Sequence, residues 1–300
     1  MTETTVQAGA SAPAAGPGIT EPGLYPGITA DQYHADPVAG GSLSSTGARR
    51  LLPPSCPALF RHEQDNGQEP RATFDFGSAA HRIVLGDGPT IHVVEAPDWR
   101  TKAAREERDA AREDGLLPLL AKDYEQVAAM ADALRAHPVA SKLFAPGTGQ
   151  PEQTLVWRDE PTGVMCRARL DWLPNKGARK RLIVPDYKTA VSAEPSAFQR
   201  AVDSYGYHQQ AAWYLSGIKA LGMDPEPQFL FVVQEKSAPY LVTVFHLDHM
   251  AMRIGAAKNR HALQVFKRCR AENRWPGYDD EVVSLQLPQW AENRDIEEYL

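Results

Sequence analysis

Two aspartates and a lysine are spaced so that they could hold a divalent metal ion and promote hydrolysis. Asp186 and Lys188 stand two residues apart in a run with strand character, so both side chains project from one face of the strand. Asp171 lies near the end of an earlier run and falls opposite Asp186 if the connection turns about residues 178–179. A hard cation such as Mg²⁺ would offset the repulsion between two such carboxylates. Lys188 could then orient a metal-bound water or stabilise charge on a phosphate.

Strands and helices alternate around these residues. Three predicted strands, 153–158, 163–173 and 181–189, have period-two alternation and are separated by turn-forming residues. Two further strands are predicted over 228–234 and 240–247. The first three are expected to form an antiparallel meander. Long helices are predicted over 196–221 and 249–273. Strands interleaved with helices indicate an α/β (α+β) fold with a central mixed β-sheet flanked by helices.

The N-terminal half differs in composition from the sheet region. Residues 1–23 are rich in Ala, Gly, Pro, Thr and Ser without an apolar period, so a disordered leader is predicted. Helices are predicted at five places in the section that follows: 43–52, from about residue 56, 74–85, 101–114 and 117–136. We therefore expect a single domain over 24–300. Its part over 24–150 should be mainly helical, and its part over 151–300 should hold the catalytic sheet and flanking helices.

The charge balance limits what the whole surface can attract. The 300 residues include 32 Lys and Arg against 38 Asp and Glu, which gives a formal net charge of −6. A nucleic-acid-binding protein that is basic over its entire surface is therefore excluded, whereas a local basic groove is not. Six cations surround the predicted turn, and they indicate either phosphate contacts or a solvated loop: Arg167, Arg169, Lys176, Arg179, Lys180 and Arg181.

Three widely spaced cysteines argue against a disulfide framework and fit a reducing, cytoplasmic setting. No Lys or Arg precedes Arg49, so the positive segment of a secretory signal is absent. The densest apolar run, 229–233, is much too short to cross a bilayer. We expect a soluble protein that does not contact a membrane.

The Asp…Asp-x-Lys pattern on consecutive strands, followed by a helix, resembles the core of PD-(D/E)XK nucleases, although a surface salt bridge has the same signature. Further segments match the same group of proteins in order: Ile28-Thr-x-x-x-Tyr33, Leu43-Ser-Ser45, Phe74-Asp-Phe-Gly-x-x-x-His81, Gln210-x-x-x-Tyr214, Trp275-Pro-Gly-Tyr278 and residues 285–290. Over about residues 26–290, the chain resembles the exodeoxyribonuclease VIII (RecE-type) family of phage and prophage recombination nucleases.

The resemblance implies a set of metal ligands. His81, Asp171 and Asp186 would hold the divalent ion, with the main-chain carbonyl of Tyr187 as a further ligand. The expected ion is Mg²⁺, and Mn²⁺ could replace it. Taken alone, His81 could equally be a hydrogen-bonded core histidine.

The resemblance also implies roles for three residues around the metal. Lys188 would position and activate the attacking water, and Gln210 and Tyr214 would support the catalytic groups. Because Gln210 and Tyr214 are one helical turn apart, an amphipathic packing stripe is the alternative interpretation.

The implied activity is a Mg²⁺-dependent exonuclease that degrades double-stranded DNA 5′→3′ from its ends. The remaining 3′ single strand would serve DNA recombination through a single-strand annealing protein. Members of that family act as closed rings, so a homo-oligomeric ring is expected, in the cytoplasm of the bacterial host of a phage or prophage. Two alternatives stay open, a structure-specific endonuclease on the same fold and a catalytically silent DNA-binding protein.

Overall fold

The computed structural model describes residues 18–66, 72–175, 177 and 181–300. Its helices are α1 (Ala30–His34), α2 (Ser45–Arg50), α3 (Pro57–Asn66), α4 (Ala72–Leu85), α5 (Lys102–Glu113), α6 (Ala121–Ala136), α7 (Ala140–Leu143), α8 (Pro195–Ser204), α9 (Tyr207–Ala220), α10 (His249–Glu272) and α11 (Gln289–Tyr299). Its strands are β1 (Gly23–Tyr25), β2 (Leu43–Ser44), β3 (Ile91–Val94), β4 (Leu117–Leu120), β5 (Gly149–Arg158), β6 (Met165–Pro174), β7 (Ile183–Ala190), β8 (Gln228–Glu235) and β9 (Val242–Phe245).

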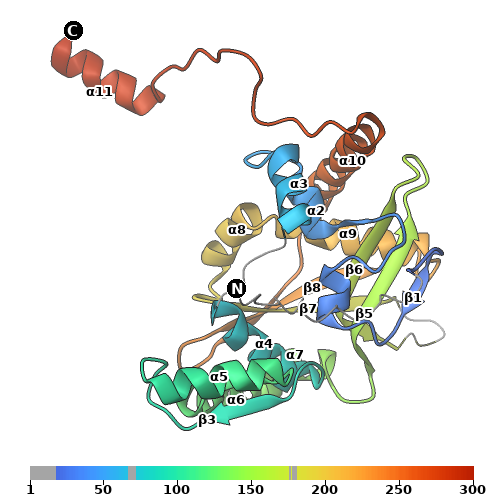
Figure 1. Ribbon diagram of the computed structural model, residues 1–300, viewed down its shortest axis with the longest axis vertical. Helices are drawn as coiled ribbons and strands as arrows, with labels where there is room; N and C mark the ends of the chain where they lie inside the picture. The colour runs from blue at the N-terminus through green and yellow to red at the C-terminus, as the bar shows by residue number, and fades with distance from the viewer. Residues whose placement is uncertain (1–17, 67–71, 176, 178–180) are drawn as a thin grey trace, which may run out of the picture.

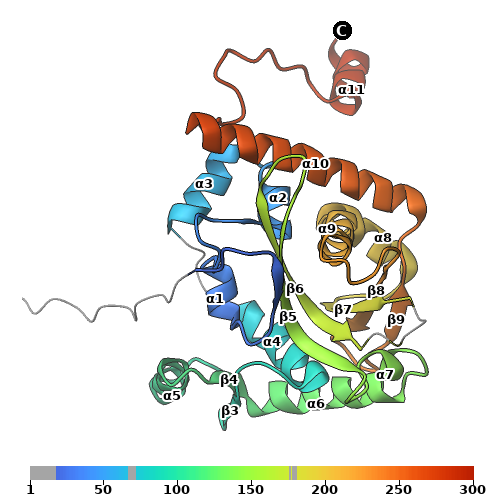
Figure 2. The same ribbon diagram turned by 90° about the vertical axis from the view of Figure 1, so that its right-hand side faces the viewer.

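The strands of the described residues form three sheets, with the orders β1-β5-β6-β2, β7-β8-β9 and β3-β4. β5 and β6 form an antiparallel hairpin, β7 and β8 pair in parallel, and β8 and β9 pair antiparallel. Helix α9 packs on β5 and β6, while α10 and α6 lie along opposite sides of the molecule (Figures 1 and 2). The expected α/β (α+β) class, with mixed pairing and a mainly helical N-terminal section, is confirmed.

The predicted meander is wrong at its third strand. Among the described residues β7 has no ladder with β6; it pairs in parallel with β8, which places Asp186 beside Phe231. Parallel partners need a crossover connection, and α8 and α9 provide it. Asp171 and Asp186 are therefore not opposed across a hairpin. The strands still meet, because the main-chain N–H of Tyr187 donates to Asp171 Oδ2 at 2.8 Å.

Two predicted helices are interrupted for identifiable reasons. The helix predicted over 196–221 is divided into α8 and α9, because Gly206 between them has a left-handed φ of 65°. A Cβ at Gly206 would lie 2.7 Å from Arg49 Cδ, so the close approach also favours glycine there. The helix predicted over 117–136 begins only at Ala121, because residues 117–120 form β4 and pair with β3.

The main apolar core fixes α9 on the β5–β6 hairpin. Trp213 of α9 is 1% exposed and meets Trp157 of β5 edge to face, with ring centroids 5.5 Å apart. Gly217, one turn later, leaves room for the same ring: a Cβ there would lie 2.8 Å from Trp157 Cζ3. Because protein interiors are close-packed, this approach sets how near α9 can lie to the sheet. The position of α9 matters because it carries two predicted site residues.

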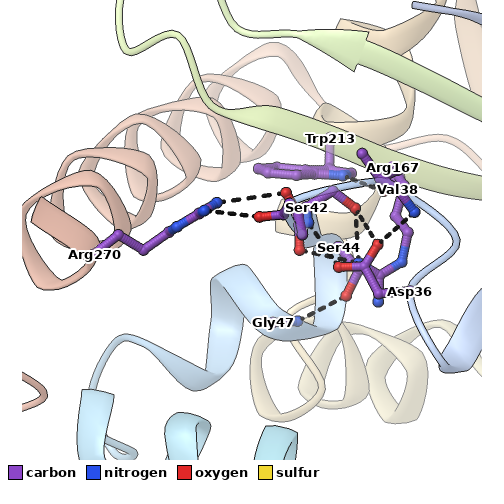
Figure 3. Close-up of polar contacts among 10 residues, drawn as sticks. Asp36, Val38, Ser42, Ser44, Gly47, Arg167, Trp213 and Arg270 are labelled. Atoms are coloured by element: carbon purple, nitrogen blue, oxygen red, sulfur yellow. Dashed lines mark hydrogen bonds and ion pairs between the residues drawn. The ribbon is translucent and has the colours of Figure 1, made fainter. Parts of the chain in front are cut away.

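A buried ion pair ties the segment before α2 to β6 (Figure 3). Arg167 is 4% exposed, and its Nη1 lies 2.8 Å from Asp36 Oδ2 and donates to the main-chain oxygen of Ser42 at 3.0 Å. Asp36 also accepts from the main-chain N–H of Ser42 at 2.6 Å. On the other side, Arg270 of α10 donates to the main-chain oxygen of Gly40 at 2.7 Å. Residues 36–42 are thus held between β6 and α10.

The two ends of the described chain meet the body differently. The main-chain N–H of Ile19 donates to the oxygen of Pro37 at 2.8 Å, whereas residues 1–17 of the predicted leader lie outside the described residues. Helix α10 ends at Asn273, whose φ of 48° is left-handed. Residues 276–300, the C-terminal arm, then lead away from the body and end in α11 (Figures 1 and 2).

The absence of disulfides expected from the cysteine spacing is confirmed. Cys56, Cys166 and Cys269 all fall in the described residues, and each is a free, buried thiol. Of the helices in the described ranges, none combines the length and apolar character needed to cross a membrane.

Candidate metal-dependent hydrolytic site

Side chains from four elements gather where β6 passes β7. Strand β7 supplies Asp186 and Lys188, β6 supplies Asp171, α4 supplies His81 and α9 supplies Gln210. The strand period places Asp186 and Lys188 on one face, as predicted, and the Lys188 ammonium forms an ion pair with Asp186 Oδ2. The local pattern therefore identified the face of β7, although it did not identify the neighbouring strand.

Asp186 is the most deeply buried carboxylate of the group, at 1% exposed. Its Oδ1 accepts a hydrogen bond of 2.9 Å from Gln210 Nε2, and its Oδ2 contacts the Lys188 ammonium. A buried carboxylate requires such partners. Gln210, which the sequence suggested as either a supporting or a packing residue, therefore fixes the orientation of Asp186.

Asp171 joins α4 to β7. Its Oδ2 accepts from the main-chain N–H of Tyr187, and the same oxygen lies 3.9 Å from His81 Nδ1. The His81 ring also packs edge-on to the Tyr187 ring, with centroids 5.2 Å apart. The Tyr187 hydroxyl donates to Gln234 Oε1 of β8 at 2.6 Å, which anchors this part of β7. His81 thus lies beside the Asp171 carboxylate and the Tyr187 ring.

Tyr214 lies behind Gln210 on α9. Its hydroxyl is hydrogen-bonded to Gln210, and its ring packs edge-on to Phe229 of β8, with centroids 5.7 Å apart. Burial raises the pKa of Tyr214 well above its ordinary value, so the hydroxyl is neutral at physiological pH. Tyr214 therefore packs against the apolar core and contacts Gln210.

Burial and mutual repulsion dominate the electrostatics of the site. Burial, together with the nearby Asp171 carboxylate, raises the pKa of Asp186 to about 7. Burial also raises the pKa of Asp171. Burial alone would lower the pKa of Lys188, but the two carboxylates raise it above its ordinary value, so Lys188 is a cation. Burial and Lys188 lower the pKa of His81 to about 4, which leaves a neutral imidazole at physiological pH.

These donors suit a hard divalent cation in their chemistry. Two carboxylates that raise each other's proton affinity, beside a neutral imidazole, form the kind of oxygen and nitrogen set that binds such ions. Within the described ranges, however, no three His, Cys, Asp or Glu side chains converge closely enough to form a metal site. The Lys188 ammonium holds the Asp186 oxygen that a cation would need, and His81 stands 3.9 Å from Asp171. The donor set fits a metal, and binding would require Lys188 to shift.

Glu152 is a third carboxylate that the sequence analysis missed. Its neighbours in β5 pair with Trp172 and Leu170 of β6, so Glu152 falls opposite Asp171. It has a left-handed φ of 52°, and its Oε2 lies 2.7 Å from Arg169 Nε. Burial and the Asp171 carboxylate raise its pKa to about 7. The strand was predicted to begin at residue 153, which left Glu152 outside it.

Arg49 of α2 is a cation at the same site that the sequence did not single out. It donates to the main-chain oxygen of Tyr205 and, at 3.1 Å, to Thr46 Oγ1, and it lies in the electrostatic field of Asp186. Tyr207 faces the other cation, with Lys188 Nζ 5.6 Å from its ring centroid. The turn at Gly206 places Tyr205 beside Arg49 and Tyr207 beside Lys188. No local sequence pattern predicts this turn.

The cations predicted around the turn divide into internal and surface positions. Arg167 pairs with the segment before α2, and Arg169 pairs with Glu152. Both guanidinium groups are committed to the fold, so neither a phosphate contact nor a solvated loop describes them. Arg181 donates to a main-chain oxygen beyond α9. The predicted cations outside the described residues are Lys176, Arg179 and Lys180.

A family model and one solved structure agree with this architecture. A model of the family described as "PDDEXK-like domain of unknown function (DUF3799)" matches residues 45–287. A presumed exonuclease from Eubacterium rectale is similar in structure, at a TM-score of 0.55 and 11% identity, over 89% of this chain and 96% of that chain. A phage-related exonuclease from Haemophilus somnus 129PT is similar at a TM-score of 0.31 and 10% identity, over 78% of this chain and 96% of that chain. No curated protein matches the sequence. At 11% identity, the similarity to the Eubacterium rectale structure shows that the two proteins share a fold, and it shows nothing about activity.

Proposed function

Since the chain belongs to the family of PDDEXK-like domains of unknown function DUF3799, we propose that it is a metal-dependent deoxyribonuclease that degrades linear double-stranded DNA from its ends. The observation that carries the proposal is the juxtaposition of Asp171, Asp186 and Lys188. These residues come from two strands that do not pair, yet they share one buried electrostatic environment. Strongly perturbed ionisable groups of this kind concentrate at catalytic sites.

The residues of the site have complementary tasks in this reaction. The metal, when bound, would supply a Lewis acid and a water of lowered pKa at the scissile phosphate. Asp171, Asp186, the neutral imidazole of His81 and the main-chain carbonyl of Tyr187 would hold it. Lys188 would leave Asp186 and face the attacking water and the phosphate, where its charge stabilises the developing negative charge.

The finer assignment is a Mg²⁺-dependent, RecE-like 5′→3′ exonuclease, with Mn²⁺ as a substitute ion. It is supported by the ordered resemblance over residues 26–290 and by the fold shared with the presumed exonuclease from Eubacterium rectale. We place the enzyme in DNA recombination, as a homo-oligomeric ring that passes a 3′ single strand to an annealing protein in the bacterial host of a phage.

The test is degradation of linear duplex DNA in Mg²⁺, with a covalently closed circle of the same sequence beside it. We expect the linear DNA to become acid-soluble, 5′-terminal label to be released first, and the circle to persist. Lys188→Ala should slow the reaction by about 100-fold or more, because an electrostatic contact to the reacting group is lost. Lys219→Ala removes an exposed lysine of α9 and should leave the rate unchanged.

Two outcomes would reject the proposal in distinguishable ways. Cleavage of the closed circle would identify a structure-specific endonuclease, and DNA binding without turnover in Mg²⁺ or Mn²⁺ would identify a silent binding protein. Titration calorimetry with Mn²⁺ examines the metal site without relying on activity. Asp186→Asn should abolish the binding heat, whereas Asp203→Asn on the exposed side of α8 should retain it.

A further inference from the structure

The C-terminal arm presents large apolar side chains to solvent. Leu285 is 87% exposed, and Trp290, at the start of α11, is 70% exposed. The side chains of Val282, Val283 and Leu287, in the extended part of the arm, are also exposed. A run of uncovered apolar side chains of this kind is typical of a protein interaction site, whereas single exposed apolar residues are not.

The root of the arm is fixed on the body and the rest projects away from it. Trp275 stacks on Phe60 with centroids 5.6 Å apart, and the main-chain N–H of Ala58 donates to the oxygen of Pro276 at 3.0 Å. Within the described residues, no hydrogen bond, ion pair or ring contact joins residues 281–300 to the body. Figures 1 and 2 show α11 standing apart from the other helices. The extended part before α11 can span about 40 Å, enough to reach onto the surface of a neighbouring body.

The arm also holds the whole net charge of the chain. Residues 276–300 contain seven of the 38 Asp and Glu and one of the 32 Lys and Arg. The preceding 275 residues therefore have equal numbers of each sign and a formal charge of zero, while the arm has −6. A surface that receives the arm must be apolar in part and cationic in part.

The body has a hollow with that character at the tip of the β5–β6 hairpin, beside α10. It measures about 430 Å³ and is lined by Arg158, Lys267 and Arg270, with Val164 and Met165 as apolar walls. No Asp or Glu is among the described residues that line it. Arg270 is held in place by the main-chain oxygens of residues 40 and 41. The hollow therefore offers fixed cations that the arm's carboxylates can reach.

We infer that the C-terminal arm docks on the body of a second copy of this chain, with its apolar side chains covered there and its carboxylates toward the Arg158–Lys267–Arg270 hollow. A second copy is the occupant because one chain displays both complementary surfaces while its own arm points away. Such a contact closes either as a reciprocal exchange of arms between two copies or as a head-to-tail series around a ring. The inference rests on the homo-oligomer of the proposed function, for which it names the contact, and it does not depend on nuclease activity.

The first test measures self-association without DNA or metal. In sedimentation velocity, the wild-type chain should show a mass that is a multiple of 33.0 kDa. Replacing Val282, Leu285 and Leu287 together by serine should weaken association by about 100-fold or more, because each buried Val or Leu side chain contributes about tenfold. Gln286→Ser, a polar change between two of these positions, should associate like wild type. A monomeric wild type, or a triple variant that associates normally, would overturn the inference.

The second test locates the acceptor surface. A fluorescent peptide of residues 276–300 should bind the triple-serine variant saturably, and raising the salt concentration should weaken that binding. Adding Lys267→Glu to the variant should reduce peptide affinity by about tenfold or more, whereas Lys219→Glu should not. Circular dichroism confirms that each variant is folded. Equal peptide affinity for both charge variants, or capture of the arm by an annealing protein while the chain stays monomeric, would contradict the assignment.

Discussion

Replacing Gly217 by alanine would place a methyl group between α9 and β5. The new Cβ would lie 2.8 and 2.9 Å from Cζ3 and Cε3 of Trp157, whereas carbon atoms in contact prefer about 3.5–4.0 Å. Trp157 is 4% exposed and packs against Trp213, so its ring has no free space to enter. Helix α9 must therefore retreat from β5 by about 1 Å.

Two opposing effects decide the stability of Gly217→Ala. Alanine is favoured over glycine in a helix by about 1 kcal/mol. Overpacking of a close-packed core costs about 1–3 kcal/mol. The steric cost is the larger here because the overlap involves a buried ring. We expect a net loss of up to about 2 kcal/mol in the free energy of unfolding, which lowers Tm by up to roughly 8 °C in a chain of this size.

The same retreat should impair the candidate site. Gln210 lies about two turns before Gly217 on α9, and its Nε2 donates to Asp186 Oδ1 at 2.9 Å. A displacement of about 1 Å breaks this hydrogen bond and can reduce a catalytic rate by about 100-fold. Gly217→Ala should therefore lose activity out of proportion to its modest loss of stability.

Urea unfolding and single-turnover cleavage of linear duplex DNA measure the two effects separately. Gly77→Ala on α4 is the matched control for stability, because no atom lies within 4 Å of the added Cβ. That control should gain up to about 1 kcal/mol. A Gly217→Ala variant as stable as wild type, with an unchanged single-turnover rate, would refute the reasoning.

Three further predictions concern buried charge. Asp36→Ala leaves the Arg167 guanidinium buried without its counter-ion, so urea unfolding should show a loss of about 3–5 kcal/mol. In EDTA, the chain should become less stable as the pH rises. Burial raises the pKa of Asp186 from 3.8 to about 7, so its stabilising contribution is complete below pH 3.8 and is lost as the pH passes through about 7. Urea midpoints at pH 5 and pH 8 should therefore differ less in Asp186→Asn than in wild type, and an equal difference would count against the assignment. Gln210→Leu removes the donor to Asp186 Oδ1 and should lower the single-turnover rate by about tenfold or more, with a smaller change in substrate affinity; an unchanged rate would mean that the hydrogen bond has no role in the reaction.

The sequence predicted those parts of the site that depend on local periodicity. The strand period placed Asp186 and Lys188 on one face, and the ion pair between them follows from that spacing. The helix predicted over residues 249–273 also agrees closely with α10, which is capped by Asp248 at its start and by Asn273 at its end. These features are set by the covalent chain and by interactions within a few residues, so a single sequence contains them.

The sequence did not predict which strands pair or how α9 is positioned. Period-two alternation shows which side of a strand is buried but says nothing about its neighbour, so β7 was assigned to β6 instead of β8. The break at Gly206 depends on contact with Arg49, which lies far away in the sequence. Glu152 was missed because its left-handed backbone and its carboxylate neighbours arise only when β5 and β6 come together.

The ion pair between Asp36 and Arg167 also determines where a separable folding unit can begin. The family match starts at residue 45, yet the partner of a guanidinium buried in the hairpin lies nine residues earlier. A fragment that starts at Ser45 would have the complete catalytic set and would still have to bury an uncompensated cation. The start of a family match is set by the residues that relatives have in common. The start of a stable folding unit is set by the residues that buried groups need as partners. In this chain the second boundary lies upstream of the first, and a fragment that keeps residues 36–42 should be more stable than one that starts at Ser45.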